Sequence, residues 1–156
     1  MGDYNRSTVE INFAHISPDI MQAVHQHIET HNFGDILNGV THCIVSTSEK
    51  IKKGLFSGPG PKVLVETAIL TNRWLILADQ MDTKPVHVRS MQLRDLVIED
   101  YEKSSFQSLI PDTGLSITGR FTDVIEQGMI FLPLGKDNAG DTFKEAIIRA
   151  VQEAKK

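Results

Sequence analysis

The chain has 156 residues, of which 40% are hydrophobic and 23% are charged, and these fractions are ordinary for a globular domain. Its net charge of −4 argues against general nucleic-acid binding, which depends on an excess of lysine and arginine. The single cysteine, Cys43, excludes an internal disulfide and fits a reducing compartment. We therefore expect one cytoplasmic domain over residues 1–156, without a signal peptide or a membrane span.

The N-terminal part, residues 1–40, is predicted to be a helical extension of this domain. Apolar and polar residues alternate over 9–13, which indicates a short edge strand. Ser17 followed by Pro18 is typical of a helix start, because serine caps the first turn and proline suits the first helical position. Together with an apolar stripe at helical spacing, this pair predicts a helix over residues 17–32.

From Thr41 onward the pattern changes to short apolar segments separated by polar turns. Such a pattern is typical of an antiparallel sheet that buries one face. Seven strands are predicted, over residues 41–48, 62–70, 73–79, 85–91, 95–101, 115–121 and 128–134.

The last predicted element is an amphipathic helix over residues 142–154. Thr142 and Glu145 have the spacing of a capping box, and Phe143 and Ile147 lie on one apolar face. This face would leave an apolar stripe in water unless it covered an open end of the barrel. The predicted fold is therefore α+β, a seven-stranded antiparallel barrel capped by a C-terminal helix, with an extra N-terminal helix.

Seven strands followed by one helix resemble the pleckstrin-homology (PH) superfold. The segment Leu70-Thr71-Asn72-Arg73-Trp74-Leu75-Ile76-Leu77 is similar to the short-turn motif of bacterial PH-like and GRAM-like domains, in which a threonine precedes an arginine and a hydrophobic strand. The resemblance covers residues 41–154. It implies two roughly orthogonal sheets capped by the helix, and a binding role rather than an enzymatic one.

The segment between the first two predicted strands, residues 50–62, is called the basic loop here. In PH domains that bind inositol phosphates, the corresponding loop carries the phosphate-binding bases. The resemblance therefore implies ligand-binding roles for Lys50, Lys52, Lys53 and Lys62, with Arg73 projecting toward the same mouth of the barrel. The alternative is a solvated loop whose lysines only aid solubility.

Two histidines of the N-terminal helix, His27 and His31, are four residues apart and so share a helix face, a spacing that can chelate zinc. No cysteine or acid completes a set of four ligands. We expect both histidines to pack beside the apolar stripe, and we predict no metal and no cofactor.

Three further residues carry potential chemistry. His42 and Cys43 are neighbours on a strand, so they point to opposite faces and do not form a thiol–base pair. Cys43 is expected to be a buried hydrophobe. For Trp74, the only tryptophan, core packing is the expected role and ligand stacking is the alternative.

Three functions stay open at this point. The first is a non-enzymatic binding or adaptor domain that engages a protein or peptide partner through a groove beside the C-terminal helix. The second is a peripheral binder of anionic lipid or phosphoinositide that uses the basic loop. The third is a small α+β barrel enzyme with a pocket lined by His42 or His87. No catalytic residue is predicted, and homo-oligomer formation is left open.

Overall fold

The computed structural model describes residues 3–51, 58–122 and 127–156. Its elements in chain order are β1 (Tyr4–Glu10), η1 (Phe13–His15), α1 (Pro18–Thr30), β2 (Val40–Lys50), β3 (Val63–Thr71), β4 (Trp74–Met81), β5 (His87–Gln92), η3 (Leu93–Asp95), β6 (Val97–Asp100), η4 (Tyr101–Lys103), η5 (Ser105–Ser108), β7 (Gly114–Gly119), β8 (Gly128–Pro133) and α2 (Asn138–Ala154).

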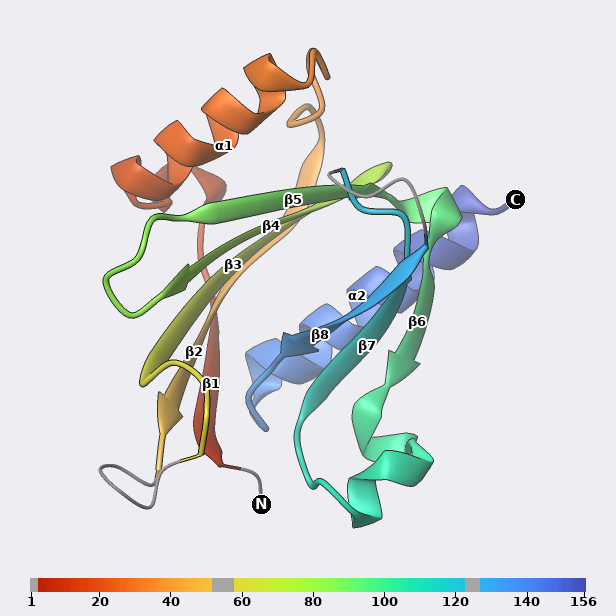
Figure 1. Cartoon of the computed structure of the whole chain (residues 1–156). Helices are drawn as coiled ribbons and strands as arrows, with labels where there is room; N and C mark the ends of the chain where they lie inside the picture. Colours follow the sequence, from red (N-terminus) through yellow and green to blue (C-terminus); the bar gives the residue numbers. More distant parts are fainter. Residues whose placement is uncertain (1–2, 52–57, 123–126) are drawn as a thin grey trace.

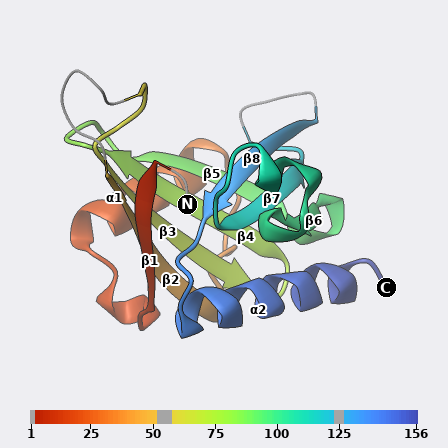
Figure 2. The same cartoon turned by 90° about the horizontal axis from the view of Figure 1, so that it is seen from below.

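The strands form two antiparallel sheets, β1-β2-β3-β4-β5 and β6-β7-β8. α1 covers one face of the larger sheet, whereas α2 and the three-stranded sheet lie against its other face (Figures 1 and 2). We call the face toward α2 the inner face and the face toward α1 the outer face. The larger apolar core lies on the inner face and contains Leu70, Leu75 and Phe143, while a second core that includes Val24 and Ile76 lies under α1.

All seven strands predicted from Thr41 onward are present, but the predicted closed barrel is wrong. One reason is β1, which pairs with β2 from Tyr4 to Glu10 and occupies the edge that a closed barrel would offer to its last strand. At the opposite edge, the β5 backbone N–H of Ser90 donates to the Thr122 hydroxyl over 2.8 Å. The turn η3 then separates β5 from β6.

The N-terminal part contributes more than the predicted helical extension. Its strand covers Tyr4–Glu10 rather than residues 9–13, and it is an integral edge of the five-stranded sheet. α1 begins at Pro18 after Ser17, as predicted, but the Ser17 side chain makes no capping hydrogen bond among the described residues, and the helix ends at Thr30 rather than at residue 32. It buries Ile20 and Val24 against the sheet.

α2 begins four residues before the predicted start. The side chain of Asp137 accepts a hydrogen bond from the Gly140 backbone N–H over 2.8 Å, so Asp137 is the N-cap and Thr142 lies inside the helix. Phe143 and Ile147 are buried in the main core, which confirms the predicted apolar face. In the part of the chain that the structure describes, neither helix has the length and apolar character needed to cross a bilayer.

The inner face of the five-stranded sheet divides into two halves. One end of the sheet holds the tight β3–β4 turn at Asn72 and Arg73, and we call it the hairpin end. The other end holds the basic loop between β2 and β3, and we call it the loop end (Figure 1). Side chains alternate along a strand, so Glu66 faces the same way as Leu70, which lies in the inner core. The inner face is thus apolar toward the hairpin end and polar toward the loop end.

Candidate functional site

Lys50, the first lysine of the basic loop, is buried rather than presented to a ligand. Its Nζ donates to the backbone carbonyl of Gly58 and, over 3.3 Å, to that of Gly60. The Tyr4 hydroxyl donates to the Pro61 carbonyl over 2.8 Å, which ties the same segment to β1. The charged side chain of Lys50 therefore stabilises the conformation of its own loop.

The structure does not bring Arg73 to Lys50 or Lys62, the two other predicted binding residues that it describes. Lys62 is exposed at the loop end, and Lys52 and Lys53 lie outside the described residues. Arg73 lies in the β3–β4 turn, so the nine residues of β3, about 30 Å at 3.3 Å per residue, separate it from the loop end. The expectation that Arg73 projects toward the same mouth is wrong, because an antiparallel hairpin places its turn opposite the loop that enters it.

His27 and His31 pack between α1 and the sheet. The Nε2 of His27 lies 2.9 Å from the Ser90 hydroxyl, and the Nδ1 of His31 lies 2.9 Å from the carbonyl oxygen of His27. The His31 ring also stacks on Phe33 with 5.3 Å between centroids. Within residues 3–51, 58–122 and 127–156, no three histidine, cysteine, aspartate or glutamate side chains are placed to hold a metal ion.

Cys43 and His42 point to opposite faces, as predicted. Cys43 is buried in the core under α1, and burial raises the pKa of its thiol to about 11. A thiol with this pKa is almost fully protonated at neutral pH and is a poor nucleophile. Trp74 is half-buried and packs against Phe33, with ring centroids 5.1 Å apart.

A groove of about 340 Å³ runs between α2 and the hairpin end of the five-stranded sheet, and we call it the α2 groove. Its apolar lining comes from Leu70, Ala146 and Ala150. Its polar lining includes His42 and, from α2, Thr142, Glu145, Arg149 and Glu153. The four α2 residues are all exposed, so the groove offers small apolar surfaces between charged and hydroxyl side chains.

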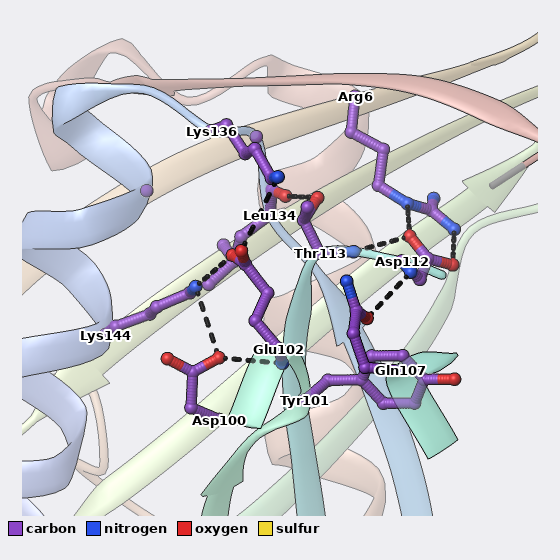
Figure 3. A network of polar contacts seen from close by, with 12 residues as sticks. Arg6, Asp100, Tyr101, Glu102, Gln107, Asp112, Thr113, Leu134, Lys136 and Lys144 are labelled. Carbon is purple, nitrogen blue, oxygen red and sulfur yellow. Dashed lines mark hydrogen bonds and ion pairs between the residues drawn. The ribbon is translucent and has the colours of Figure 1, made fainter. Parts of the chain in front are cut away.

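Buried polar contacts hold α2 in this position (Figure 3). The Lys144 ammonium lies 3.0 Å from the Glu102 carboxylate and 3.4 Å from that of Asp100. Burial lowers the pKa of Lys144, but the hydrogen bond to Glu102 and the charge of Asp100 raise it more, so the pKa lies above its ordinary value. At the start of the helix, Asp137 accepts from the Thr8 backbone N–H over 2.8 Å and so joins α2 to β1.

A second polar contact joins the two sheets directly. Arg6 of β1 makes a two-pronged ion pair with Asp112, with N–O distances of 2.7 and 2.8 Å (Figure 3). Its guanidinium carbon lies 5.4 Å from the centre of the Phe131 ring on β8. The backbone N–H of Asp112 donates to the Gln107 side chain over 3.0 Å, so the segment before β7 is held in place as well.

Two acids lie buried side by side in the polar half of the inner face. Glu66 and Asp79 are directly opposite each other on β3 and β4, and they are 3% and 5% exposed. One oxygen of each carboxylate has no hydrogen-bond partner among the described residues, and the guanidinium of Arg89 lies 3.7 Å from the Asp79 carboxylate. Burial, and then the charge of Asp79, raise the pKa of Glu66 to about 7. His87, which the enzyme hypothesis considered, lies 3.6 Å from Asp79.

The sequence indicated a groove beside the C-terminal helix but did not identify its residues. The capping-box spacing predicts that Thr142 caps the helix, and no sequence pattern identifies Arg149 as a site residue. Helical spacing places Glu145, Arg149 and Glu153 on one face, but it does not show that this face borders the sheet edge at Leu70. No protein-family model, no curated protein and no solved structure matches this chain.

Proposed function

We propose that this protein is a non-enzymatic binding domain with a PH-like fold, and that it engages a peptide segment of a partner protein through the α2 groove. The observation that carries the proposal is the groove itself, with its apolar lining between the polar side chains of α2. Ligand sites in proteins are commonly apolar hollows with a few polar groups that fix orientation, and volumes start at about 300 Å³.

The order of the elements supports the PH-like assignment. Strands β2 to β5 are followed by the three strands of the second sheet and then by α2, which packs on the inner face. β1 and α1 are additions to this arrangement. A shared fold does not define a ligand, so the function rests on the groove and not on the resemblance.

A second feature also favours a binding role. Phe106, Leu109 and Ile110 are 60%, 78% and 65% exposed, and they lie in and directly after the short turn η5. Clusters of exposed large apolar side chains commonly mark interaction sites. This apolar patch is therefore the rival docking surface in the test below.

The anionic-lipid alternative has less support. It relies on the basic loop, in which Lys50 is engaged with backbone carbonyls and Lys62 is exposed, while Lys52 and Lys53 lie outside the described residues. Anionic surfaces contribute about 1 kcal/mol per nearby lysine, so Lys62 by itself provides little affinity.

The test is a selection of displayed random peptides on the immobilised domain, followed by titration of an enriched peptide. Arg149→Trp fills the α2 groove from an exposed position and should weaken peptide binding at least tenfold. Gln152→Trp introduces the same side chain on the same helix outside the groove lining, and it should have no effect. A peptide that binds the Arg149→Trp variant as tightly as wild type would contradict the proposal. Loss of binding in Phe106→Ser alone would move the site to the apolar patch.

A further inference from the structure

A second hollow, of about 560 Å³, lies at the hairpin end of the five-stranded sheet, beside the β3–β4 turn. It is lined by Asn72, Arg73, Trp74, Gln92, Arg94 and Ala154. Two arginines, a tryptophan, an asparagine and a glutamine therefore line one space, and no acidic residue is part of its lining. We call it the arginine hollow.

The backbone that carries these side chains is held firmly. The Thr71 hydroxyl is buried and accepts from the backbone N–H groups of Arg73 and Trp74, over 3.1 and 2.8 Å. The Arg73 carbonyl accepts from the Leu93 N–H over 2.9 Å. Leu93 is fully buried and begins the short turn that presents Arg94. Because the backbone is already ordered, a ligand has to order only the two arginine side chains.

Both guanidinium groups are uncommitted. Arg6 is paired with Asp112, but Arg73 and Arg94 form no ion pair and no side-chain hydrogen bond with the residues that the structure describes. Glu153 precedes Ala154, which lines the hollow, and its carboxylate forms an ion pair with the Lys156 ammonium at 2.8 Å. Both arginines are also exposed.

Trp74 places an aromatic ring beside these charges. It is directly opposite Gln92 in the β4–β5 register, so their side chains share one face of the sheet. Trp74 also contacts Phe33, with ring centroids 5.1 Å apart, and as a residue it is half-buried. An indole face and a guanidinium plane are both surfaces on which planar rings stack.

We propose that the arginine hollow binds a phosphate monoester carried by a planar ring, of which a nucleoside monophosphate is the simplest example. A phosphate monoester carries about −1.5 to −2 charges at neutral pH, which matches the two guanidinium groups. Arginine binds phosphate through two parallel N–H···O bonds, a geometry that lysine does not offer. The indole and the amides of Asn72 and Gln92 are placed to contact the ring. This site is separate from the α2 groove, although Asn72 borders both.

The only tryptophan of the chain lies in the hollow, so intrinsic fluorescence reports occupancy directly. Adenosine monophosphate, inorganic phosphate and adenosine are titrated separately at low salt. We expect a saturable change with the monophosphate, weaker binding of inorganic phosphate, and no binding of adenosine. Arg73→Gln and Arg94→Gln should each weaken binding of the monophosphate about tenfold. Arg120→Gln, which removes an exposed arginine outside the hollow, should leave binding unchanged.

Three results would overturn the inference. These are the absence of saturable binding to the monophosphate, adenosine binding as tightly as the monophosphate, and unchanged affinity in Arg73→Gln and Arg94→Gln. Inorganic phosphate that binds as tightly as the monophosphate would also contradict the ring contact with Trp74. The Arg149→Trp variant, which fills the α2 groove, should bind the monophosphate normally when binding is measured by calorimetry, because its added tryptophan also fluoresces. Failure of one proposal is then distinguishable from failure of the other.

Discussion

The two halves of the five-stranded sheet's inner face use charge in opposite ways. At the loop end, charged groups point inward: Lys50 binds backbone carbonyls, and Glu66 lies beside Asp79 under the second sheet. At the hairpin end, the inward positions are apolar and are covered by α2, while Arg73 and Arg94 face solvent. The halves belong to the same strands and differ only in which residues occupy the inward positions.

This difference separates charged groups that lie inside the fold, where Lys50 stabilises it and ionised Glu66 costs stability, from charged groups that are exposed. The sequence indicates the basic loop as the binding element, yet its first lysine, Lys50, makes hydrogen bonds within the protein. Arg73 and Arg94 at the other end have no ion pair and no side-chain hydrogen bond within residues 3–51, 58–122 and 127–156. Substitutions at the loop end should therefore change stability more than binding, and substitutions at the hairpin end should change binding more than stability.

The largest effect on stability is expected in the apolar half. Phe143 of α2 is 1% exposed and is among the largest fully buried side chains. Phe143→Ala should lower the free energy of unfolding by about 3–5 kcal/mol, because it removes buried apolar area and leaves a cavity. Urea denaturation measures this change. Gln152→Ala, on the exposed side of the same helix, should change it by less than about 0.5 kcal/mol, and equal effects of the two would mean that α2 does not dock as described.

The second-largest effect on stability is expected in the polar half, where the unfolding free energy should depend on pH through Glu66. Glu66 has a pKa of about 7 in the folded protein and an ordinary value of 4.5, so the folded state binds more protons between these limits. The unfolding free energy should therefore fall as pH rises through this window, by on the order of 3 kcal/mol from this group alone. Glu66→Gln should remove that fall.

The measurement for Glu66 is a set of urea denaturation curves at several pH values from 4.5 to 8. Glu49→Gln serves as the control, because Glu49 is an exposed glutamate on the neighbouring strand β2. Wild type and Glu66→Gln with parallel stability profiles would show that Glu66 is ionised throughout and that its burial is incomplete.

A smaller loss is expected at Lys50. Lys50→Met keeps the length of the side chain but removes the donor to the carbonyls of Gly58 and Gly60. A hydrogen bond made by a charged group contributes about 1.5–3 kcal/mol, and the unfolding free energy should fall by up to that amount. Lys62→Met changes an exposed lysine of the same loop and should cost less than about 0.5 kcal/mol. Indistinguishable stabilities of the two variants would contradict the internal role of Lys50.

The smallest effect on stability is expected at the hairpin end. Arg73→Gln and Arg94→Gln remove exposed charges that have no ion pair among the described residues. The free energy of unfolding, measured by thermal denaturation, should therefore change by less than about 0.5 kcal/mol. A loss comparable to that of Lys50→Met would mean that these arginines are structural, and the contrast between the two ends would disappear.

The sequence by itself determined the local elements from Thr41 onward, because alternation along a strand and the stripe of α2 follow from the geometry of each element. It also separated Cys43 from His42, since neighbours on a strand point to opposite faces. It did not determine that β1 covers the edge of β2, or that α2 begins at Asn138 under the Asp137 cap.

Only the tertiary structure decided which charges are available. Whether Lys50 is free depends on carbonyls eight and ten residues away that fold back over it. Whether Arg73 and Arg94 share a hollow depends on the bond between the Arg73 carbonyl and Leu93, which brings two turns together. Periodicity assigns a side chain to a face of its own element, but its partners come from other elements, and their positions are set by packing across the whole core.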